Sequence, residues 1–273
     1  MRFAALPLLL GALLLTLAAP ARAADELTLL LDWFVNPDHA PILIAEETGL
    51  FEERGLEVEV IAPADPNDPP KLVAAGRADI AVSYQPQLHI QANAGLPLVR
   101  VGTLVATPLN TLVVLEDGGI ESVADLKGRK VGFSVGGFED ALLGAMLAEH
   151  GLSLDDVELV NVNFALSPAL LSGQVDAVIG AFRNFELNQL ELEGRPGRAF
   201  YPEEEGVPPY DELIFIANRG ALDDDRLPRF ALRPAALDVG RYERFAAFLA
   251  KQGLIDSPPP VDSYAVDLGR RRG

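Results

Sequence analysis

The segment from Leu31 to Pro41 carries the side chains best suited to recognising a flat polar molecule. It contains Trp33, the only tryptophan of the chain, together with Asp32, Asn36 and His39. Stacking of a base on an aromatic side chain contributes about 1–3 kcal/mol. Carboxylate, amide and imidazole groups can bind the polar edge of such a ring. The segment is therefore a candidate binding loop, although position alone leaves a half-buried core role for Trp33 equally open.

The flanking sequence places this loop between a strand and a helix. The apolar run Leu27–Leu31 predicts a strand, and Pro41–Thr48 is compatible with a helix. Asn36-Pro37-Asp38 is typical of a turn. Ligands of open α/β sheets bind outside the carboxyl ends of the strands, so the loop lies where a site is expected.

Short apolar runs alternate with helix-compatible segments along the rest of the chain. This alternation predicts an α/β fold with parallel sheets that are covered on both faces. The predicted strands are 27–31, 57–61, 80–82, 99–104, 111–115, 130–133, 157–161, 177–180 and 213–217. The predicted helices are 41–48, 69–75, 86–94, 138–150, 167–171 and 186–192.

Two segments repeat one pattern and predict two similar lobes. Residues 75–82 and 172–179 both read as a helix end, a capping glycine, an aspartate and an apolar strand, although any αβ unit can look like this. The segments expected to connect the two lobes are residues 107–110 and 201–210. We predict that residues 24–110 and 216–273 form lobe 1 and that residues 111–215 form lobe 2. Two crossing strands would then join the lobes and leave a cleft between them.

Composition limits the class of protein. Residues 1–23 have an apolar core and end in Ala21-Arg22-Ala23, which predicts a signal peptide cleaved near Ala23-Ala24 and a soluble periplasmic protein. Without Arg2 and Arg22, the 22 basic and 40 acidic residues become 20 and 40, a net charge of −20. Such a field disfavours nucleic acid and anionic membranes as partners. The chain has no cysteine, and its three histidines lack metal-ligand spacing, so we expect neither disulfides nor a metal site.

Several sequence blocks resemble a known family. Residues 49–60, Gly-Leu-Phe-Glu-Glu-Arg-Gly-Leu-Glu-Val-Glu-Val, resemble a block of the periplasmic solute-binding proteins of ABC importers. The chain is more narrowly similar to the formylaminopyrimidine-binding branch, which shares its fold with the thiamine pyrimidine synthases. The matching blocks are residues 32–39, 69–73, 83–88, 107–110, 126–132 and 180–186. The resemblance implies a type II periplasmic-binding-protein fold, a thiamine-precursor pyrimidine as ligand, an ABC permease as partner, a monomer, no cofactor and no enzymatic activity.

An aminopyrimidine has apolar faces and a polar edge, which assigns roles to cleft residues. Trp33 and Tyr84 offer stacking faces, and Glu186 offers an acceptor for the exocyclic amine. His39 either caps a helix or contacts the ligand, and each amide could equally be a turn former or a helix cap. The further candidate ligand-binding residues are Asn36, Gln85, Asn110, Phe182 and Asn184.

A glycine loop at residues 134–140 is a further candidate contact. Gly136 and Gly137 precede a predicted helix, and such loops can bind phosphate. Glu139 and Asp140 in the first turn already complement the helix dipole and would repel a phosphate. We therefore predict backbone contact with an unphosphorylated ligand, the alternative being a flexible loop with a helix cap.

Three alternatives bear on function. The synthase that shares this fold resembles the chain at Trp33 and His39, but it depends on a pyridoxal-phosphate lysine and on cysteines. This chain has Ser83 at the corresponding strand end and no cysteine. Relatives that bind sulfonate or nitrate would need convergent cations, and only Arg183 is a cleft candidate, whereas riboflavin stays open as a ligand.

Near residues 227–229 the chain is expected to be shortened relative to the family, with Pro228 ending a helix that starts at 221.

Overall fold

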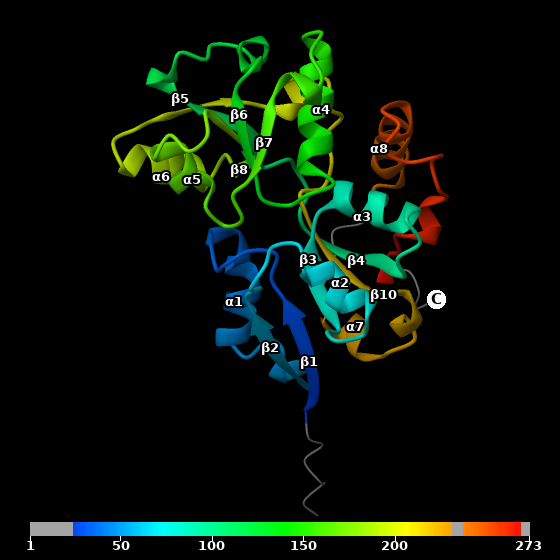
Figure 1. The fold of residues 1–273 in the computed structure, drawn as a ribbon. Coiled ribbons are helices and arrows are strands. Elements are labelled where there is room, and N and C mark those ends of the chain that lie inside the picture. The colour runs from blue at the N-terminus through cyan, green and yellow to red at the C-terminus, as the bar shows by residue number, and fades with distance from the viewer. Residues whose placement is uncertain (1–23, 231–236, 269–273) are drawn as a thin grey trace, which may run out of the picture.

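The structure, a computed structural model, describes residues 24–230 and 237–268. The predicted signal peptide, residues 1–23, lies outside the described residues. The described chain forms two five-stranded sheets with helices packed against them, and Figure 1 shows the two units one above the other. We call the unit that contains β1 lobe 1 and the unit that contains β5 lobe 2. None of the helices in these residues is long and apolar enough to cross a membrane.

Lobe 1 is built on a sheet with the strand order β2-β1-β3-β10-β4. Strand β1 pairs in parallel with β2 and β3, while β10 runs antiparallel to β3 and β4. Every residue of β3 is buried, as expected of a strand covered on both faces. The elements of this lobe are β1 (Asp25–Leu30), α1 (Ala40–Glu47), β2 (Leu56–Ile61), α2 (Pro69–Ala74), β3 (Ile80–Ser83), α3 (Gln85–Asn93), β4 (Leu98–Val105), β10 (Leu213–Asn218), α7 (Arg226–Phe230) and α8 (Val239–Lys251).

Lobe 2 has the strand order β7-β6-β8-β5-β9. Strand β6 pairs in parallel with β7 and β8, and β5 runs antiparallel to β8 and β9. Both β5 and β8 are buried along their whole length. The elements of this lobe are β5 (Asn110–Leu115), β6 (Lys130–Phe133), α4 (Glu139–Glu149), β7 (Glu158–Asn161), α5 (Leu166–Leu171), β8 (Ala177–Phe182), α6 (Glu186–Leu192) and β9 (Gly197–Phe200).

The two sheets share one topology, which confirms the predicted pair of similar α/β lobes. Strands β3 and β8 are each the third strand of their sheet. Each follows a helix that is capped by a glycine in the left-handed region, Gly76 at φ +67° and Gly173 at φ +72°. The predicted parallel pairing holds for β1, β2 and β3 and for β6, β7 and β8, but both sheets are mixed. The chain enters lobe 2 on β5 and returns to lobe 1 on β10, and each of these strands runs opposite to its neighbours.

Two segments connect the lobes, residues 106–109 between β4 and β5 and residues 201–212 between β9 and β10. Glu212 on the second segment accepts hydrogen bonds from the backbone N–H groups of Leu109 at 2.6 Å and Asn110 at 2.8 Å. This buried carboxyl therefore holds the two crossing segments together. The lobe boundaries remain our proposal, and β10 begins three residues before the one placed at residue 216.

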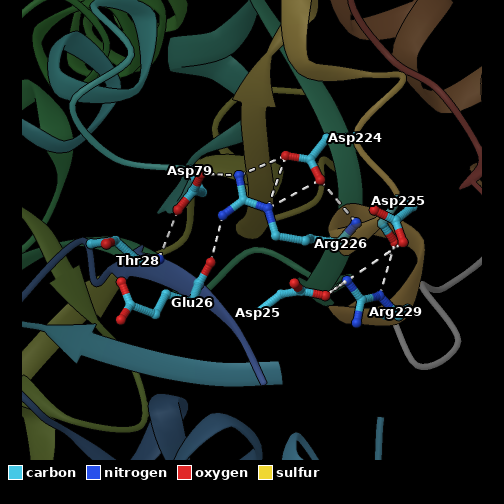
Figure 2. A network of polar contacts seen from close by, with 8 residues as sticks. All are labelled: Asp25, Glu26, Thr28, Asp79, Asp224, Asp225, Arg226 and Arg229. Carbon is cyan, nitrogen blue, oxygen red and sulfur yellow. Dashed lines mark hydrogen bonds and ion pairs between the residues drawn. The ribbon is translucent and has the colours of Figure 1, made fainter. Parts of the chain in front are cut away.

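Ion pairs fix the segment after β10 to one end of the sheet of lobe 1. Arg226 Nη2 lies 2.7 Å from Asp79 Oδ1, and Arg229 Nη2 lies 2.6 Å from Asp25 Oδ2. Figure 2 shows these pairs beside the start of β1. The segment is thus held by partly exposed charges as well as by apolar packing.

The predicted end of this helix at Pro228 is wrong. Helix α7 runs from Arg226 to Phe230 and contains Pro228 at its third position. The first turn of a helix tolerates proline because its backbone N–H groups have no partner within the helix. Beyond the proline, the ring of Phe230 stacks on Phe51 with 5.5 Å between the ring centroids. Residues 231–236, which follow, lie outside the described residues.

Candidate functional site

A small pocket lies between the lobes, where the loop after β1 faces the end of β8 and the start of α6. Its free volume of about 20 Å³ is room for about one water molecule. The lobes are therefore closed on each other, and a heterocycle can enter only after they separate. The pocket is lined by Asp32, Trp33, Asn36 and Tyr84 from lobe 1 and by Glu139, Gly180, Phe182, Phe185 and Glu186 from lobe 2.

The pocket brings together five of the eleven predicted site residues. These are Trp33, Asn36, Tyr84, Phe182 and Glu186. They come from three separate stretches of the sequence, and both lobes contribute. Ligand contact by any of them remains a prediction, but their convergence on one pocket is what the prediction requires.

Local hydrogen bonds fix the loop that carries Trp33. Asn36 Oδ1 accepts from the backbone N–H of Asp38 at 2.9 Å and caps the short 3₁₀ helix Pro37–His39. His39 Nδ1 accepts from the backbone N–H of Asn36 at 3.3 Å. Its proton is then on Nε2, which donates to Asp32 Oδ1 at 2.9 Å. The fully buried His39 thus completes a capping box and holds Asp32 from behind the pocket.

Aromatic rings from both lobes meet around the pocket. The Trp33 ring packs edge-on against Phe164 of lobe 2, with 4.7 Å between centroids. Tyr84, at the end of β3, stacks on Phe138 of lobe 2 at 4.8 Å. The Tyr84 hydroxyl donates to Asp32 Oδ2 at 2.8 Å, so both oxygens of that carboxyl accept hydrogen bonds. The ring of Tyr84 therefore has a fixed orientation beside the pocket.

Two glutamates from lobe 2 add buried carboxyl groups. Glu139 Oε2 accepts from the backbone N–H groups of Ser134 at 2.7 Å and Val135 at 3.1 Å. Glu186 Oε2 accepts from the backbone N–H of Phe182 at 2.6 Å. Burial, the largest effect, raises the pKa of Glu139 to about 8 and that of Glu186 to about 7. Near neutral pH each of these two carboxyl groups can therefore bind or release a proton.

Gly180 on β8 makes room for Glu139. Its φ is +101°, a conformation that side chains rarely adopt, and a Cβ atom there would lie 2.5 Å from Glu139 Oε1. A glycine is therefore required where this strand passes under the carboxyl group of α4.

The pocket has acids but no opposing cation. No lysine or arginine is among its lining residues. Arg183, the one cation expected near the cleft, is held by Glu203 through two contacts of 2.7 and 3.0 Å and lies over the ring of Tyr201. Within the described residues, no group of three or more metal-ligating side chains is placed to hold an ion. The electrostatics therefore favour a ligand that donates hydrogen bonds or carries positive charge.

Two predicted site residues lie behind the cleft and support it. Gln85 is fully buried, and its Oε1 accepts from the backbone N–H of Asp211 on the second crossing segment at 2.7 Å. Asn110 Oδ1 accepts from the backbone N–H of Gly180 at 3.1 Å. Neither side chain lines the pocket, so the structure gives both a positioning role.

Three further predicted residues lie outside the pocket, and two of them join the lobes. Asn184 Nδ2 donates to Asp38 Oδ1 at 2.6 Å, from lobe 2 to lobe 1. The backbone N–H of Gly136 donates to Asn67 Oδ1 at 3.1 Å, again between lobes. The backbone N–H of Gly137 donates within its own loop, to Asp140 Oδ1 at 2.7 Å. In the closed form these residues hold the lobes or the loop, and their contact with a ligand remains a prediction.

Sequence reasoning did not select four lining residues: Asp32, Glu139, Gly180 and Phe185. Asp32 lies next to Trp33 in the candidate loop, and this position could have identified it as a pocket residue. Glu139 was interpreted only as a charge complementing a helix dipole. Its burial depends on Gly180, which lies far away in the sequence, so no local pattern indicates it.

The chain is similar in sequence to several curated proteins. A thiamine biosynthesis protein of Haemophilus influenzae is 49% identical over 300 aligned positions, which cover 93% of this chain and 96% of that protein. The formylaminopyrimidine-binding protein of Halalkalibacterium halodurans is 35% identical over 207 residues, 76% of this chain and 63% of that protein. A 4-amino-5-hydroxymethyl-2-methylpyrimidine phosphate synthase of Legionella pneumophila is 31% identical over 167 residues. These cover 61% of this chain and 52% of the synthase.

The solved structures confirm the predicted fold. The alkanesulfonate-binding protein of Xanthomonas axonopodis has a TM-score of 0.65 with 18% identity, over 89% of this chain and 98% of that chain. At this identity the likeness shows the periplasmic-binding-protein fold alone. The family model described as NMT1/THI5 like matches residues 36–232. The chain therefore belongs to the NMT1/THI5-like family.

Proposed function

We propose that this protein is the solute-binding component of an ABC importer and captures a thiamine-precursor pyrimidine, either formylaminopyrimidine or hydroxymethylpyrimidine. The observation that carries the proposal is the pocket itself, in which an indole ring and buried carboxyl groups converge without an opposing cation. The names of two relatives, one a thiamine biosynthesis protein and one a formylaminopyrimidine-binding protein, support the same ligand class.

The chemistry of an aminopyrimidine suits the groups that line the pocket. Trp33 and Tyr84 offer faces for a flat ring, and Glu186 offers an acceptor for the exocyclic amine. The indole Nε1–H of Trp33 is buried without a hydrogen-bond partner among the described residues. A buried donor that lacks a partner is unfavourable by about 1–3 kcal/mol. A ligand oxygen or nitrogen placed beside this group would remove that penalty.

Other ligands of the fold are less compatible with the site. A sulfonate, a nitrate or a phosphorylated pyrimidine would enter a pocket with three carboxyl groups, Asp32, Glu139 and Glu186, and with no lysine or arginine in its lining. Repulsion between like charges is strong where water is excluded. Riboflavin is uncharged and aromatic, so it remains the alternative ligand and has to be tested directly.

The enzyme alternative lacks a residue to anchor its cofactor. At the end of β3, where a pyridoxal lysine is expected from the resemblance, Ser83 donates a hydrogen bond to Gln87 Oε1 at 2.9 Å. The four lysines of the chain are Lys71, Lys127, Lys130 and Lys251, and none lines the pocket. We therefore propose a binding role without covalent chemistry. An absorbance band of a pyridoxal aldimine in the protein incubated with pyridoxal phosphate would contradict it.

Delivery to a permease requires export and lobe movement. We propose that residues 1–23 direct the chain to the periplasm, that it acts there as a monomer, and that the lobes close by rotation about the crossing segments 106–109 and 201–212. The amino-terminal sequence of the exported protein tests the first point, with Ala24 as the expected first residue. A retained leader would contradict it.

Calorimetry against a ligand panel tests the function. The panel contains formylaminopyrimidine, hydroxymethylpyrimidine, thiamine, riboflavin and an alkanesulfonate. We expect at least one of the two pyrimidines to bind more tightly than every other compound by a factor of ten or more. If riboflavin or the sulfonate binds best, the ligand assignment fails and the solute-binding role survives. If none of the panel binds, the ligand assignment has no support.

A further inference from the structure

Glu139 is a buried pocket residue with one of its two carboxyl oxygens held by backbone hydrogen bonds. One of its oxygens, Oε2, accepts from two backbone N–H groups, those of Ser134 and Val135. The other, Oε1, lies over Gly180, which also lines the pocket. The side chain is only 3% exposed. Glu139 and Gly180 both line the pocket, so the carboxyl group lies at the pocket wall with Oε2 held by the backbone.

The groups that face Glu139 are almost all acidic. Asp32 and Glu186 share the pocket with it, Asp140 follows it on α4, and Glu212 approaches from the second crossing segment. The Tyr84 hydroxyl and His39 both donate to Asp32. Arg183, on the connection between β8 and α6, is paired with Glu203. No lysine or arginine is among the residues that line the pocket with Glu139.

Glu139 lines the closed pocket between the lobes, which has about 20 Å³ of free space. We therefore expect a ligand to enter an open cleft in which water can reach this carboxyl group. Closure then removes the water and leaves several acids together in a region of low polarity, which disfavours the charged form of each. The raised pKa of Glu139, about 8 in the closed structure against an ordinary 4.5, has this cause.

We infer that the pocket binds its pyrimidine together with one proton from solvent, held between Glu139 Oε1 and a ring nitrogen of the ligand. The inference rests on the proposed function and adds the protonation state of the bound complex to it. The proton moves from water to this pair, and no covalent bond between ligand and protein forms. Whether it resides on the carboxyl oxygen or on the ring nitrogen, the pair forms one hydrogen bond and carries one negative charge fewer than the open site.

The proton shared between Glu139 and a ring nitrogen also determines which ligands the pocket prefers. An aminopyrimidine has weakly basic ring nitrogens that can share the proton. In the corresponding aniline, a benzene ring with the same amine replaces the pyrimidine ring and carries no ring nitrogen. The aniline can stack on Trp33 and donate to Glu186, but it cannot share a proton with Glu139. We expect the aniline to bind at least tenfold more weakly than the pyrimidine. Glu139 is therefore a specificity-determining residue in addition to those predicted from the sequence.

Calorimetry with hydroxymethylpyrimidine, in buffers of different ionisation enthalpy at pH 7, measures the proton uptake. We expect uptake approaching one proton per ligand in the unaltered protein. Glu139→Gln keeps the size and a hydrogen-bond donor but cannot titrate, so its uptake should fall close to zero while it still binds. Glu186→Gln should keep most of the uptake. Glu191→Gln, an exposed change on α6, is the matched control and should behave like the unaltered protein.

The outcomes separate this inference from the proposed function. Binding of the pyrimidine without proton uptake overturns the inference and leaves the function standing. Loss of uptake in Glu186→Gln, with uptake retained in Glu139→Gln, also overturns it because the proton then belongs to the other carboxyl group. Failure of both formylaminopyrimidine and hydroxymethylpyrimidine to bind at all overturns the proposed ligand, and the inference fails with it.

Discussion

The hydrogen bond between Asn184 and Asp38 should control how long the cleft stays closed. It joins the connection between β8 and α6 of lobe 2 to the 3₁₀ helix of lobe 1, with 2.6 Å between Nδ2 and Oδ1. Burial raises the pKa of Asp38, and the bond from Asn184 opposes that rise. When the lobes separate, both side chains return to water. The bond therefore stabilises the closed form only, and Asn184→Ala should shift the equilibrium toward the open form.

The size of the effect follows from the environment of the pair. Hydrogen bonds to charged groups contribute about 1.5–3 kcal/mol when protected from water. Asn184 is exposed, so water replaces part of the lost bond, and about 1 kcal/mol is the better value. This corresponds to roughly a fivefold change in an equilibrium constant. Because the contact forms after encounter, the change should appear in the dissociation rate and leave the association rate unaltered.

Stopped-flow fluorescence with hydroxymethylpyrimidine measures both rates. The dissociation rate of Asn184→Ala should rise about fivefold, and Glu191→Ala, an exposed change on the following helix α6, should not change it. A double-mutant cycle with Asp38→Ala isolates the pair and should give a coupling near 1 kcal/mol. An unchanged dissociation rate together with a coupling near zero would refute the assignment of this bond to closure.

Three further predictions concern the pocket. Trp33→Ala and Glu186→Gln should each weaken pyrimidine binding at least tenfold, about 1.4 kcal/mol, and unchanged affinity by calorimetry in both would contradict the site. In the closed, pyrimidine-bound form between pH 4.5 and 8, Glu139 binds more protons than in the unfolded chain, so its contribution to the free energy of unfolding should decrease as pH rises. Urea denaturation in saturating hydroxymethylpyrimidine should show a flatter pH dependence for Glu139→Gln, and an identical slope would contradict the raised pKa. Gly180→Ala should lower the free energy of unfolding by about 2 kcal/mol or more. Gly173→Ala, at a φ of +72° with no atom near its Cβ position, should lower it by only about 1 kcal/mol, and equal losses would contradict the steric argument.

Much of the fold is predictable because its signals are local. Nine predicted strands and six predicted helices match elements of the structure, with ends shifted by at most two residues. The missed strand β9 (Gly197–Phe200) is short and half-buried and lies at a sheet edge, so its sequence carries no apolar run. The missed helix α8 had a usable signal, since its buried residues Tyr242, Phe245, Ala246 and Leu249 follow helical spacing.

The candidate site is less predictable because burial is a tertiary property. Trp33 and Tyr84 follow strands at the expected edge of the sheet, and both reach the pocket. Gln85 lies next to Tyr84 but begins α3 and points to a crossing segment instead. Nothing local distinguishes these two neighbours. Glu139 shows the opposite case, because a glycine on another strand turns an apparent helix-capping acid into a pocket residue.

Fluorescence of the single tryptophan tests the central claim most directly. Trp33 is the only tryptophan in the sequence and lines the pocket, so its emission reports on the proposed stacking without labelling. Titration with formylaminopyrimidine and with hydroxymethylpyrimidine should change that emission saturably for at least one of them, with the same dissociation constant as calorimetry. An alkanesulfonate should leave the emission unchanged. Calorimetric binding of a pyrimidine with no change in Trp33 emission, or a saturable response to the sulfonate alone, would contradict the account.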